Sequence, residues 1–212
     1  MNYSVITINN ERHSNVQKID DILSNSFEKI NLEYIDGKND ISLNDFFVKN
    51  PDIKLSRGNF TKGQIGCFAS HFLIWKHIVE NNLKNTIIFE DDAIIYDYFI
   101  KDYNNAIDNV PEDWDILTLF VPFDQIGTYY NKDITINEYI CQCYQNWSTL
   151  CYSVSLNGAK KLYDTALKHG MDSPVDWFMF FRGKRKFFNI YSLPPTKPFP
   201  VGIDTNYKSQ VK

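Results

Sequence analysis

Short apolar runs alternate along the chain with longer segments whose apolar positions keep the spacing of an amphipathic helix. The runs rich in β-branched and aromatic residues predict strands at residues 3–8, 32–35, 86–89, 114–120, 149–155 and 189–193. The helical spacing predicts helices at residues 14–27, 61–82, 98–107, 157–169 and 172–181. Residues 3–35 alone have the size and order of a parallel βαβ unit. The sequence therefore predicts an α/β domain.

One of these strands leads directly into three consecutive carboxylates, Glu90, Asp91 and Asp92. In open α/β sheets, ligands bind at the carboxyl ends of the strands, where these side chains would lie. Adjacent carboxylates repel one another unless a cation or several donors compensate their charge. In extended chain, Glu90 and Asp92 point one way and Asp91 the other, which offers two oxygen ligands to a hard divalent ion. A solvated acidic turn is an equally good interpretation of these residues alone.

The predicted helix at residues 61–82 begins with unusually small residues, among them Gly63, Gly66 and Ser70. Glycine disfavours helices, so its presence indicates that backbone or a ligand approaches closely there. His71 in the same helix is more typical of a packed core histidine than of a ligand.

Three other parts of the chain have weaker patterns. Residues 38–60 are polar and poorly patterned. Residues 121–147 form an irregular, aromatic-rich insertion, with a hairpin expected between residues 134 and 147. Because four prolines follow residue 193, we expect one domain over residues 1–193 and an extended C-terminal tail or lid over residues 194–212.

The composition narrows the class of protein. With 43% hydrophobic and 16% aromatic residues, the chain can build a proper core. A formal net charge of −4 argues against nucleic acid as a partner. The basic run at residues 182–186 is typical of a solvated turn, with contact to an anionic acceptor or a membrane surface as the alternative.

The sequence contains neither a recognisable signal segment nor a transmembrane segment. No charged-then-apolar segment opens the chain, and no run of apolar residues is long enough for a transmembrane segment. We expect a cytoplasmic protein, with peripheral contact at the inner face of the membrane as the alternative. The four cysteines, Cys67, Cys141, Cys143 and Cys151, lack the paired spacing of a zinc site, so we expect reduced thiols, mostly in the core.

Several separated segments together carry a family pattern, in one order along residues 3–180. They are Gly63-Gln64-Ile65-Gly66-Cys67 with Ser70-His71 and Trp75, Ile87-Ile88-Phe89-Glu90-Asp91-Asp92, Trp114-Asp115-Ile116-Leu117, Tyr152-Ser153-Val154-Ser155 with Gly158-Ala159-Lys160-Lys161-Leu162, and Pro174-Val175-Asp176. By these residues the chain resembles glycosyltransferase family 25, which includes lipooligosaccharide and collagen galactosyltransferases. It departs from the family pattern at Asn10, Asn15, Gln64 and Ser148, where the family usually has Leu, Arg, Glu and Gly.

The resemblance implies a Rossmann-like single domain of the GT-A type, with a central, mostly parallel sheet flanked by helices. It also implies a nucleotide-sugar donor, typically UDP-galactose, used with Mn²⁺ (or Mg²⁺) and with inversion at the anomeric carbon. The expected enzyme is a β-galactosyltransferase acting on a glycan acceptor such as a lipooligosaccharide core.

Site roles follow from the same resemblance. Asp92 is the expected principal metal ligand, with Glu90 assisting it or reaching the donor ribose. Asp91 is expected to accept hydrogen bonds from helix or loop donors. The expected donor-binding residues, for each of which a surface or capping role is an equal alternative, are Asn9, Arg12, Asp36 and Ser70.

The acceptor hydroxyl must lose a proton, and Asp176 is the candidate base, with a first-turn acid of a helix as the alternative. Aromatic residues that could form an acceptor platform are Phe123, Tyr129, Tyr130, Trp147 and Trp177, although such residues are often core. Two other readings remain open: a non-catalytic nucleotide-sugar-binding relative, and another metal-dependent nucleotide or sugar-phosphate enzyme.

Overall fold

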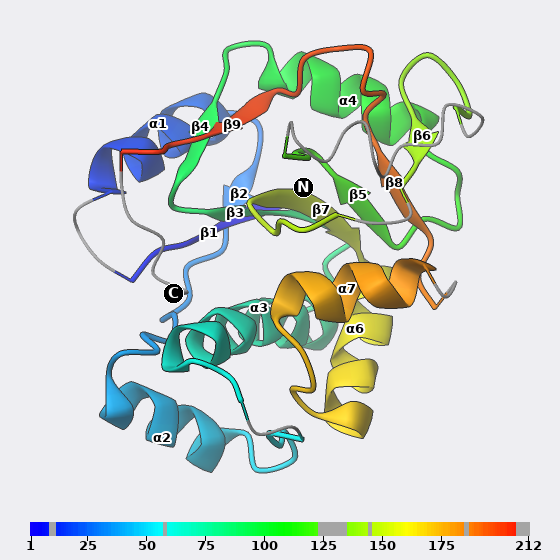
Figure 1. The fold of residues 1–212 in the computed structure, drawn as a ribbon. Helices are drawn as coiled ribbons and strands as arrows, with labels where there is room; N and C mark the ends of the chain where they lie inside the picture. Colours follow the sequence, from blue (N-terminus) through cyan, green and yellow to red (C-terminus); the bar gives the residue numbers. More distant parts are fainter. Residues whose placement is uncertain (9–11, 57–58, 123–134, 144–145, 185–186, 207–212) are drawn as a thin grey trace.

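The computed structural model describes residues 1–8, 12–56, 59–122, 135–143, 146–184 and 187–206 (Figure 1). At its centre lies a seven-stranded sheet with the strand order β2-β1-β3-β7-β5-β8-β6. The strands of this sheet are β1 (Asn2–Ile6), β2 (Glu28–Lys29), β3 (Asn85–Glu90), β5 (Ile116–Thr118), β6 (Cys141–Gln142), β7 (Cys151–Ser155) and β8 (Ile190–Ser192). All of them except β6 and β7 run in one direction. The expected α/β domain with a mostly parallel sheet is therefore confirmed.

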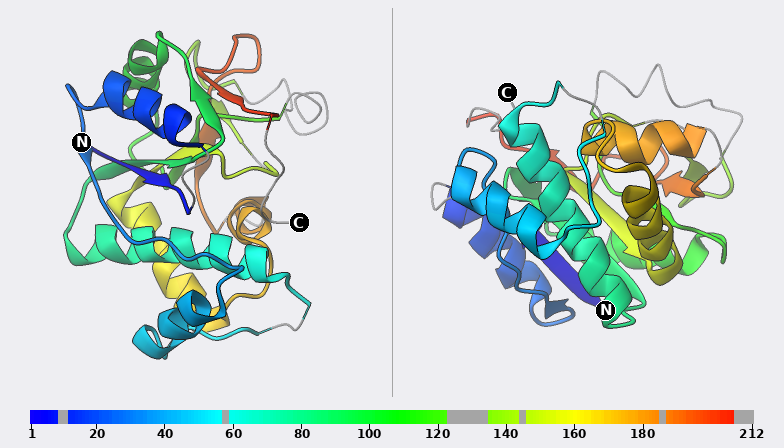
Figure 2. Two further views of the ribbon diagram at one scale, coloured as in Figure 1. Left: turned by 90° about the vertical axis from the view of Figure 1, so that its left-hand side faces the viewer. Right: turned by 90° about the horizontal axis from the view of Figure 1, so that it is seen from below.

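Helices cover both faces of this sheet (Figure 1; Figure 2). One face carries α1 (His13–Leu23) and α4 (Phe99–Asn109), beside a small antiparallel sheet of β4 (Ala93–Ile95) and β9 (Val201–Ile203). The other face carries α3 (Lys62–Glu80), α6 (Leu156–His169) and α7 (Val175–Lys184), with α2 (Asp40–Lys49) packed against α3. Among the described residues, no helix is both long and apolar enough to cross a bilayer.

The apolar run of β3 is explained by burial on both faces, because a strand covered on two sides has no polar position to alternate with. Ile87 and Phe89 pack into the core that α1 and α4 cover, whereas Ile88 packs into the core under α3 and α6. All three side chains are fully buried. By the same alternation Glu90, the last residue of β3, is directed toward the α3 face.

The small residues at the start of α3 admit a neighbouring segment of backbone. A Cβ atom on Gly66 would lie 2.5 Å from Gly37 N and 2.8 Å from Ile35 O. The helix itself begins with a capping box, in which Thr61 Oγ1 accepts from Gln64 N–H and Gln64 Oε1 accepts from Thr61 N–H. The close approach expected from the glycines is thus made by the loop at residues 35–37.

The predicted strand at residues 32–35 is wrong. The chain pairs with the outer edge of β1 only through the two-residue strand β2. Residues 32–35 lie against α3 instead, where Ile35 N–H donates to Ser70 Oγ at 3.0 Å and the Tyr34 hydroxyl contacts the Ser4 hydroxyl. The apolar side chains of this segment pack into the α3 core, so burial against the helix replaced pairing in the sheet.

The C-terminal segment returns to the domain. Its strand β9 pairs antiparallel with β4, and Val201 is buried. The next residue after β9, Asp204, donates its N–H to Asp92 O at 2.8 Å. The tail therefore lies against the turn that follows β3.

The hairpin expected between residues 134 and 147 falls in part on residues 123–134 and 144–145, which lie outside the described residues. The described part contains an antiparallel bridge between Thr135 and Cys141 and the pairing of β6 with β8. Cys141, Cys143 and Cys151 are buried in the core, as expected for most of the thiols.

Candidate active site

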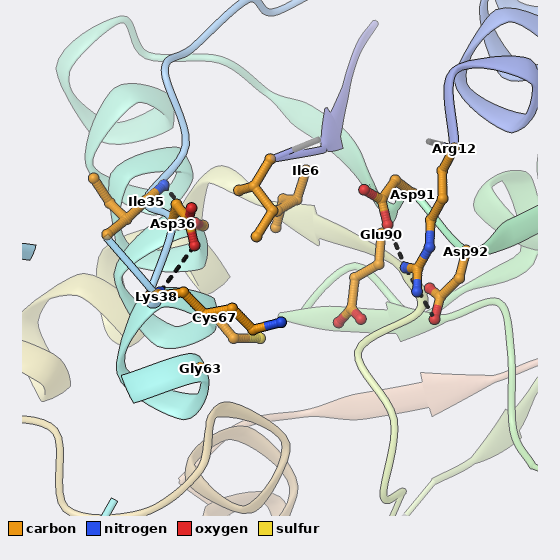
Figure 3. Close-up of a pocket in the computed structure, with 13 residues that line it drawn as sticks. Ile6, Arg12, Ile35, Asp36, Lys38, Gly63, Cys67, Glu90, Asp91 and Asp92 are labelled. Atoms are coloured by element: carbon orange, nitrogen blue, oxygen red, sulfur yellow. Dashed lines mark hydrogen bonds and ion pairs between the residues drawn. The ribbon is translucent and has the colours of Figure 1, made fainter. Parts of the chain in front are cut away.

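The carboxyl ends of β1 and β3 open onto a pocket that the loop at residues 35–38 and the start of α3 also line (Figure 3). Its lining residues are Ile6, Ile8, Arg12, Ile35, Asp36, Gly37, Lys38, Gly63, Cys67, Ser70, Glu90, Asp91 and Asp92. The expected site residues that meet here are Arg12, Asp36, Ser70, Glu90 and Asp92. Asn9 lies outside the described residues. Segments far apart in the sequence thus converge at the edge of the sheet where the carboxylates were expected.

Arg12, just before α1, holds the acidic turn. Its Nη1 atom lies 2.5 Å from Asp91 Oδ1 and 3.6 Å from Asp92 Oδ2. The expected alternation of the three acids is wrong, because β3 ends at Glu90 and residues 91–92 form a turn. Asp91 and Asp92 therefore reach the same guanidinium, while Glu90 extends to another side of the pocket (Figure 3).

The charge on this turn is only partly compensated. Burial raises the pKa of Asp91, although the opposing effect of Arg12 limits the rise. Burial and the nearby Glu90 carboxylate raise the pKa of Asp92 to about 7. Asp92 Oδ1 is also buried without a hydrogen-bond partner among the described residues. Asp91 is thus the main structural partner of Arg12, and Asp92 is the carboxylate that lacks compensation.

Glu90 belongs to a second polar cluster beneath α3. Thr149 Oγ1 donates to Glu90 Oε1 at 2.5 Å, and His71 Nε2 lies 3.5 Å from the same oxygen. Burial alone would raise the pKa of Glu90, but the contacts with His71 and Thr149 bring it below its usual value. His71 is fully buried, and its Nδ1 lies 2.8 Å from the Tyr152 hydroxyl, which also accepts from Trp75 Nε1. The histidine is packed in the core, as expected, but it also borders the site.

The loop at residues 35–38 forms the opposite wall of the pocket. Asp36 Oδ1 accepts from Lys38 N–H at 2.9 Å, which fixes the turn. The Ser70 hydroxyl donates to Gly66 O and accepts from Ile35 N–H, so it fastens this loop to α3. The exposed Lys38 extends its side chain into the pocket (Figure 3). Ser70 therefore positions the wall, and Lys38 adds a cation that the sequence interpretation missed.

Asp176 lies in the first turn of α7, outside the lining of the pocket, and its Oδ1 accepts from Trp177 N–H at 2.8 Å. Burial, and after it the charge of Glu90, raises the pKa of Asp176, so the two carboxyls act on one another electrostatically. The next residue, Trp177, is 44% exposed and meets the Trp147 ring edge-on at a centroid distance of 4.4 Å. The other proposed platform residues, Phe123, Tyr129 and Tyr130, lie outside the described residues.

Two further contacts at the acidic turn could not be predicted from any motif in the sequence. Asn15 Nδ2 donates to Asp91 O at 3.3 Å and to Asp204 Oδ2 at 3.1 Å. Because Asp204 comes from the C-terminal tail, this pairing joins residues 189 positions apart. Thr149, which donates to Glu90 from just before β7, likewise belongs to no motif that points to the site. Such long-range partners follow from the fold and not from any local motif.

The residues of this pocket fit a hard divalent ion. Three carboxylates face one guanidinium, which leaves the cluster with excess negative charge if all three ionise. The buried Oδ1 of Asp92 is without a hydrogen bond from the described residues, and carboxylate oxygens are the ligands that such ions prefer. Asp92 would hold the ion, with Glu90 as the second carboxylate of the pocket.

Fold and pocket together define the class of protein: an α/β domain with an acidic pocket at the carboxyl edge of its sheet. The family model described as "Glycosyltransferase family 25 (LPS biosynthesis protein)" matches residues 5–179. The chain belongs to glycosyltransferase family 25, as the motifs indicated.

Curated relatives agree with this placement. The chain is 30% identical over 159 residues to procollagen galactosyltransferase 2 of Homo sapiens, covering 70% of this chain and 25% of that protein. It is 34% identical over 122 residues to procollagen galactosyltransferase 1-A of Xenopus laevis, covering 56% of this chain and 20% of the relative. A third relative, "Inactive glycosyltransferase 25 family member 3" of Mus musculus, is 28% identical over 192 residues, which cover 82% of this chain and 31% of the relative. The chain thus spans less than a third of the length of each of these relatives.

The Arg12 contact predicts a large loss of stability when the cation is removed. Arg12→Met should lower the free energy of unfolding by about 3 kcal/mol or more, because the buried Asp91 would lose its charged partner. The exposed pair of Lys62 and Asp40 supplies the control: Lys62→Met should cost at most about 1 kcal/mol. Urea unfolding of the three proteins measures both values, and equal losses for the two variants would contradict a structural role for Arg12.

Proposed function

We propose that this chain is a metal-dependent glycosyltransferase that transfers galactose from UDP-galactose to a glycan acceptor with inversion at the anomeric carbon. The observation that carries the proposal is Asp92, a half-buried carboxylate in the pocket whose buried Oδ1 accepts no hydrogen bond from the described residues. Membership of the family supports the reaction class, and the galactosyltransferase relatives support the choice of sugar.

The charges of the pocket argue for a metal-dependent donor. A nucleoside diphosphate is an anion, and it would meet the carboxylates of Glu90, Asp91 and Asp92, against which the described residues place the single guanidinium of Arg12 in ion-pair contact with the turn. Like charges at this range repel strongly in a partly buried site. A divalent ion held at Asp92 supplies the positive charge that binds the diphosphate and stabilises it as a leaving group.

The protein's own groups can position the rest of the donor. Lys38 extends into the pocket from the opposite wall, where its ammonium group can contact phosphate oxygens. Asp36, beside it, keeps a second carboxylate oxygen for a ribose or base donor group, since Oδ1 is used in the turn. Ile8 and Ile35 supply apolar surface next to these polar groups. Arg12 serves the donor indirectly, by holding the turn that presents Asp92.

Asp176 is the proposed general base. It comes from α7, on the α3 face of the sheet, whereas the acidic turn contacts Arg12 beside α1 on the other face. Inversion requires the acceptor hydroxyl to attack from the side opposite the leaving diphosphate, which suits a base supplied from a different element. Burial raises the pKa of Asp176, which makes its ionised carboxylate a better proton acceptor.

The acceptor is proposed to be a glycan, such as a lipooligosaccharide core, held beside α7. The exposed ring of Trp177 directly follows Asp176 and packs against Trp147, and aromatic faces are suitable platforms for sugar rings. The family description names LPS biosynthesis, which supports a saccharide acceptor of this kind.

A non-catalytic, nucleotide-sugar-binding role is the second candidate, and one observation favours it. A mouse family member that is 28% identical to this chain is described as inactive. The intact acidic turn and the presence of Asp176 favour turnover instead. Measurement of UDP release distinguishes the two candidates, because both would bind the donor but only the enzyme would release UDP from it.

The donor site is tested by Asp92→Asn with Asp40→Asn, an exposed acid of α2, as the matched control. The unmodified protein should release UDP from UDP-galactose in preference to other UDP-sugars, with Mn²⁺ and not with EDTA. Asp92→Asn should weaken Mn²⁺-dependent donor binding by about 100-fold or more, because it removes the proposed metal ligand. The measurements are UDP release and calorimetric titration with UDP-galactose. Unchanged metal dependence in Asp92→Asn would exclude the proposed ligand, and binding without any UDP release would favour the non-catalytic candidate.

The base is tested by Asp176→Asn, which keeps an oxygen to accept from Trp177 N–H. The rate constant kcat should fall by about 10²–10⁴-fold, the usual contribution of a general base, while donor affinity stays nearly constant. Asp164→Asn, an exposed acid of α6, is the control and should leave both quantities unchanged. Steady-state kinetics with a glycan that accepts galactose measure kcat for each variant. A kcat of Asp176→Asn equal to that of the unmodified protein would exclude Asp176 as the base.

A further inference from the structure

Three potential metal ligands, two from α3 and one from β3, lie close together beside the pocket. Cys67 and His71 lie four residues apart in α3 and so on one face of the helix, and Glu90 ends β3 opposite them. The Cys67 sulfur, a ring nitrogen of His71 and a carboxylate oxygen of Glu90 all lie within 4.8 Å of one another. The family resemblance assigned Glu90 to an oxygen-ligated ion but gave no ligand role to Cys67 or His71.

His71 points independently to a ligand. It is fully buried, yet its Nε2 makes no hydrogen bond with the described residues, although it lies 3.5 Å from Glu90 Oε1. Its other nitrogen, Nδ1, lies 2.8 Å from the Tyr152 hydroxyl. Tyr152 can accept from Nδ1–H and from Trp75 Nε1 together, because a hydroxyl oxygen has two lone pairs. In the tautomer that carries its proton on Nδ1, Nε2 offers a lone pair to an ion bound beside Glu90, and metal-binding histidines are held in the same way by a partner on the other nitrogen.

We propose that Cys67, His71 and Glu90 form a binding site for a thiophilic divalent ion of the zinc class. With Zn–S of about 2.3 Å and Zn–N or Zn–O of about 2.0–2.2 Å, tetrahedral ligand atoms lie roughly 3.4–3.6 Å apart. The contact between His71 and Glu90 already has this length, at 3.5 Å. The remaining separations are at most 4.8 Å, so binding an ion requires the Cys67 sulfur to approach the other two ligand atoms by about 1 Å at most.

The fourth position of such a site faces the pocket, because Cys67 and Glu90 both line it. Catalytic zinc sites typically have three protein ligands and one open position, whereas structural sites have four protein ligands. An ion can therefore enter from the pocket and leave through it. The coordinating ion also deprotonates the thiol, so a buried neutral Cys67 does not prevent binding.

This site differs from the proposed donor-metal site in chemistry. Sulfur and imidazole ligands select zinc-class ions, whereas the oxygens of Asp92 and of a diphosphate select Mn²⁺ or Mg²⁺. The two sites share Glu90, so an ion bound by Cys67 and His71 draws that carboxylate away from the donor. Given the proposed transferase activity, zinc-class ions should compete with Mn²⁺-supported transfer.

Binding is tested without nucleotide or acceptor, by titrating the purified chain with Co²⁺, a coloured substitute for Zn²⁺. The unmodified protein should bind one Co²⁺ with a near-ultraviolet thiolate-to-cobalt absorption band, which Zn²⁺ should then abolish. Cys67→Ser should lose this band, while Cys141→Ser, which removes a buried core thiol, should keep it. A band that survives in Cys67→Ser, or no band in the unmodified protein, would overturn the proposal.

A second measurement guards against a variant that fails to fold. Zinc-edge X-ray absorption of the unmodified protein, loaded with one equivalent of Zn²⁺, should show one sulfur neighbour among nitrogen and oxygen neighbours. A zinc shell without sulfur would overturn the site even if Cys67→Ser could not be prepared. Because neither measurement uses a sugar nucleotide, their failure would leave the proposed transferase activity intact, and loss of that activity would not affect them.

Discussion

The buried contact between Arg12 and the acidic turn constrains the whole site. Three carboxylates follow one another at the end of a strand whose two faces are covered, where unpaired charge is costly. The guanidinium supplies one positive charge to Asp91 and Asp92 from the start of α1. The guanidinium lies closer to Asp91 than to Asp92, so the negative charge of Asp92 in the pocket is only partly compensated. Arg12 therefore stabilises the turn, and a further cation is the proposed partner of Asp92.

The same turn connects the donor pocket to the C-terminal tail. Asp204 binds the backbone of Asp92 through its N–H and the side chain of Asn15 through its carboxylate. Asn15 in turn donates to the backbone of Asp91. The position where the family usually has a second arginine therefore carries an amide that joins α1, the acidic turn and the tail. The tail, expected as an arm or a lid, is therefore hydrogen-bonded to the turn through Asp204.

Much of this site could be predicted from the sequence because its strongest signals are local. The apolar run into Glu90 identified the end of a buried strand, and the glycines of α3 indicated a close backbone approach, which Gly66 makes with Gly37. The direction of the three acids could not be predicted, because it depends on where β3 stops and on an arginine 79 positions earlier. Residues 32–35 were mistaken for a strand because packing against α3 buries the same apolar side chains as pairing would. The environment of His71 depends on Tyr152, which only the folded sheet brings near it.

The proposed division of labour is that one side of the pocket binds the donor and α7 serves the acceptor. Lys38 and Asp36 belong to the donor side, and Asp176 and Trp177 to the acceptor side. The central claim is that Asp92 and the diphosphate share one oxygen-ligated ion. A crystal structure of the complex with UDP and Mn²⁺ measures this directly, through the anomalous scattering of manganese. The account predicts a single manganese peak within coordination distance of both Asp92 Oδ1 and the diphosphate. Diphosphate bound in the pocket with no manganese at Asp92 would contradict it.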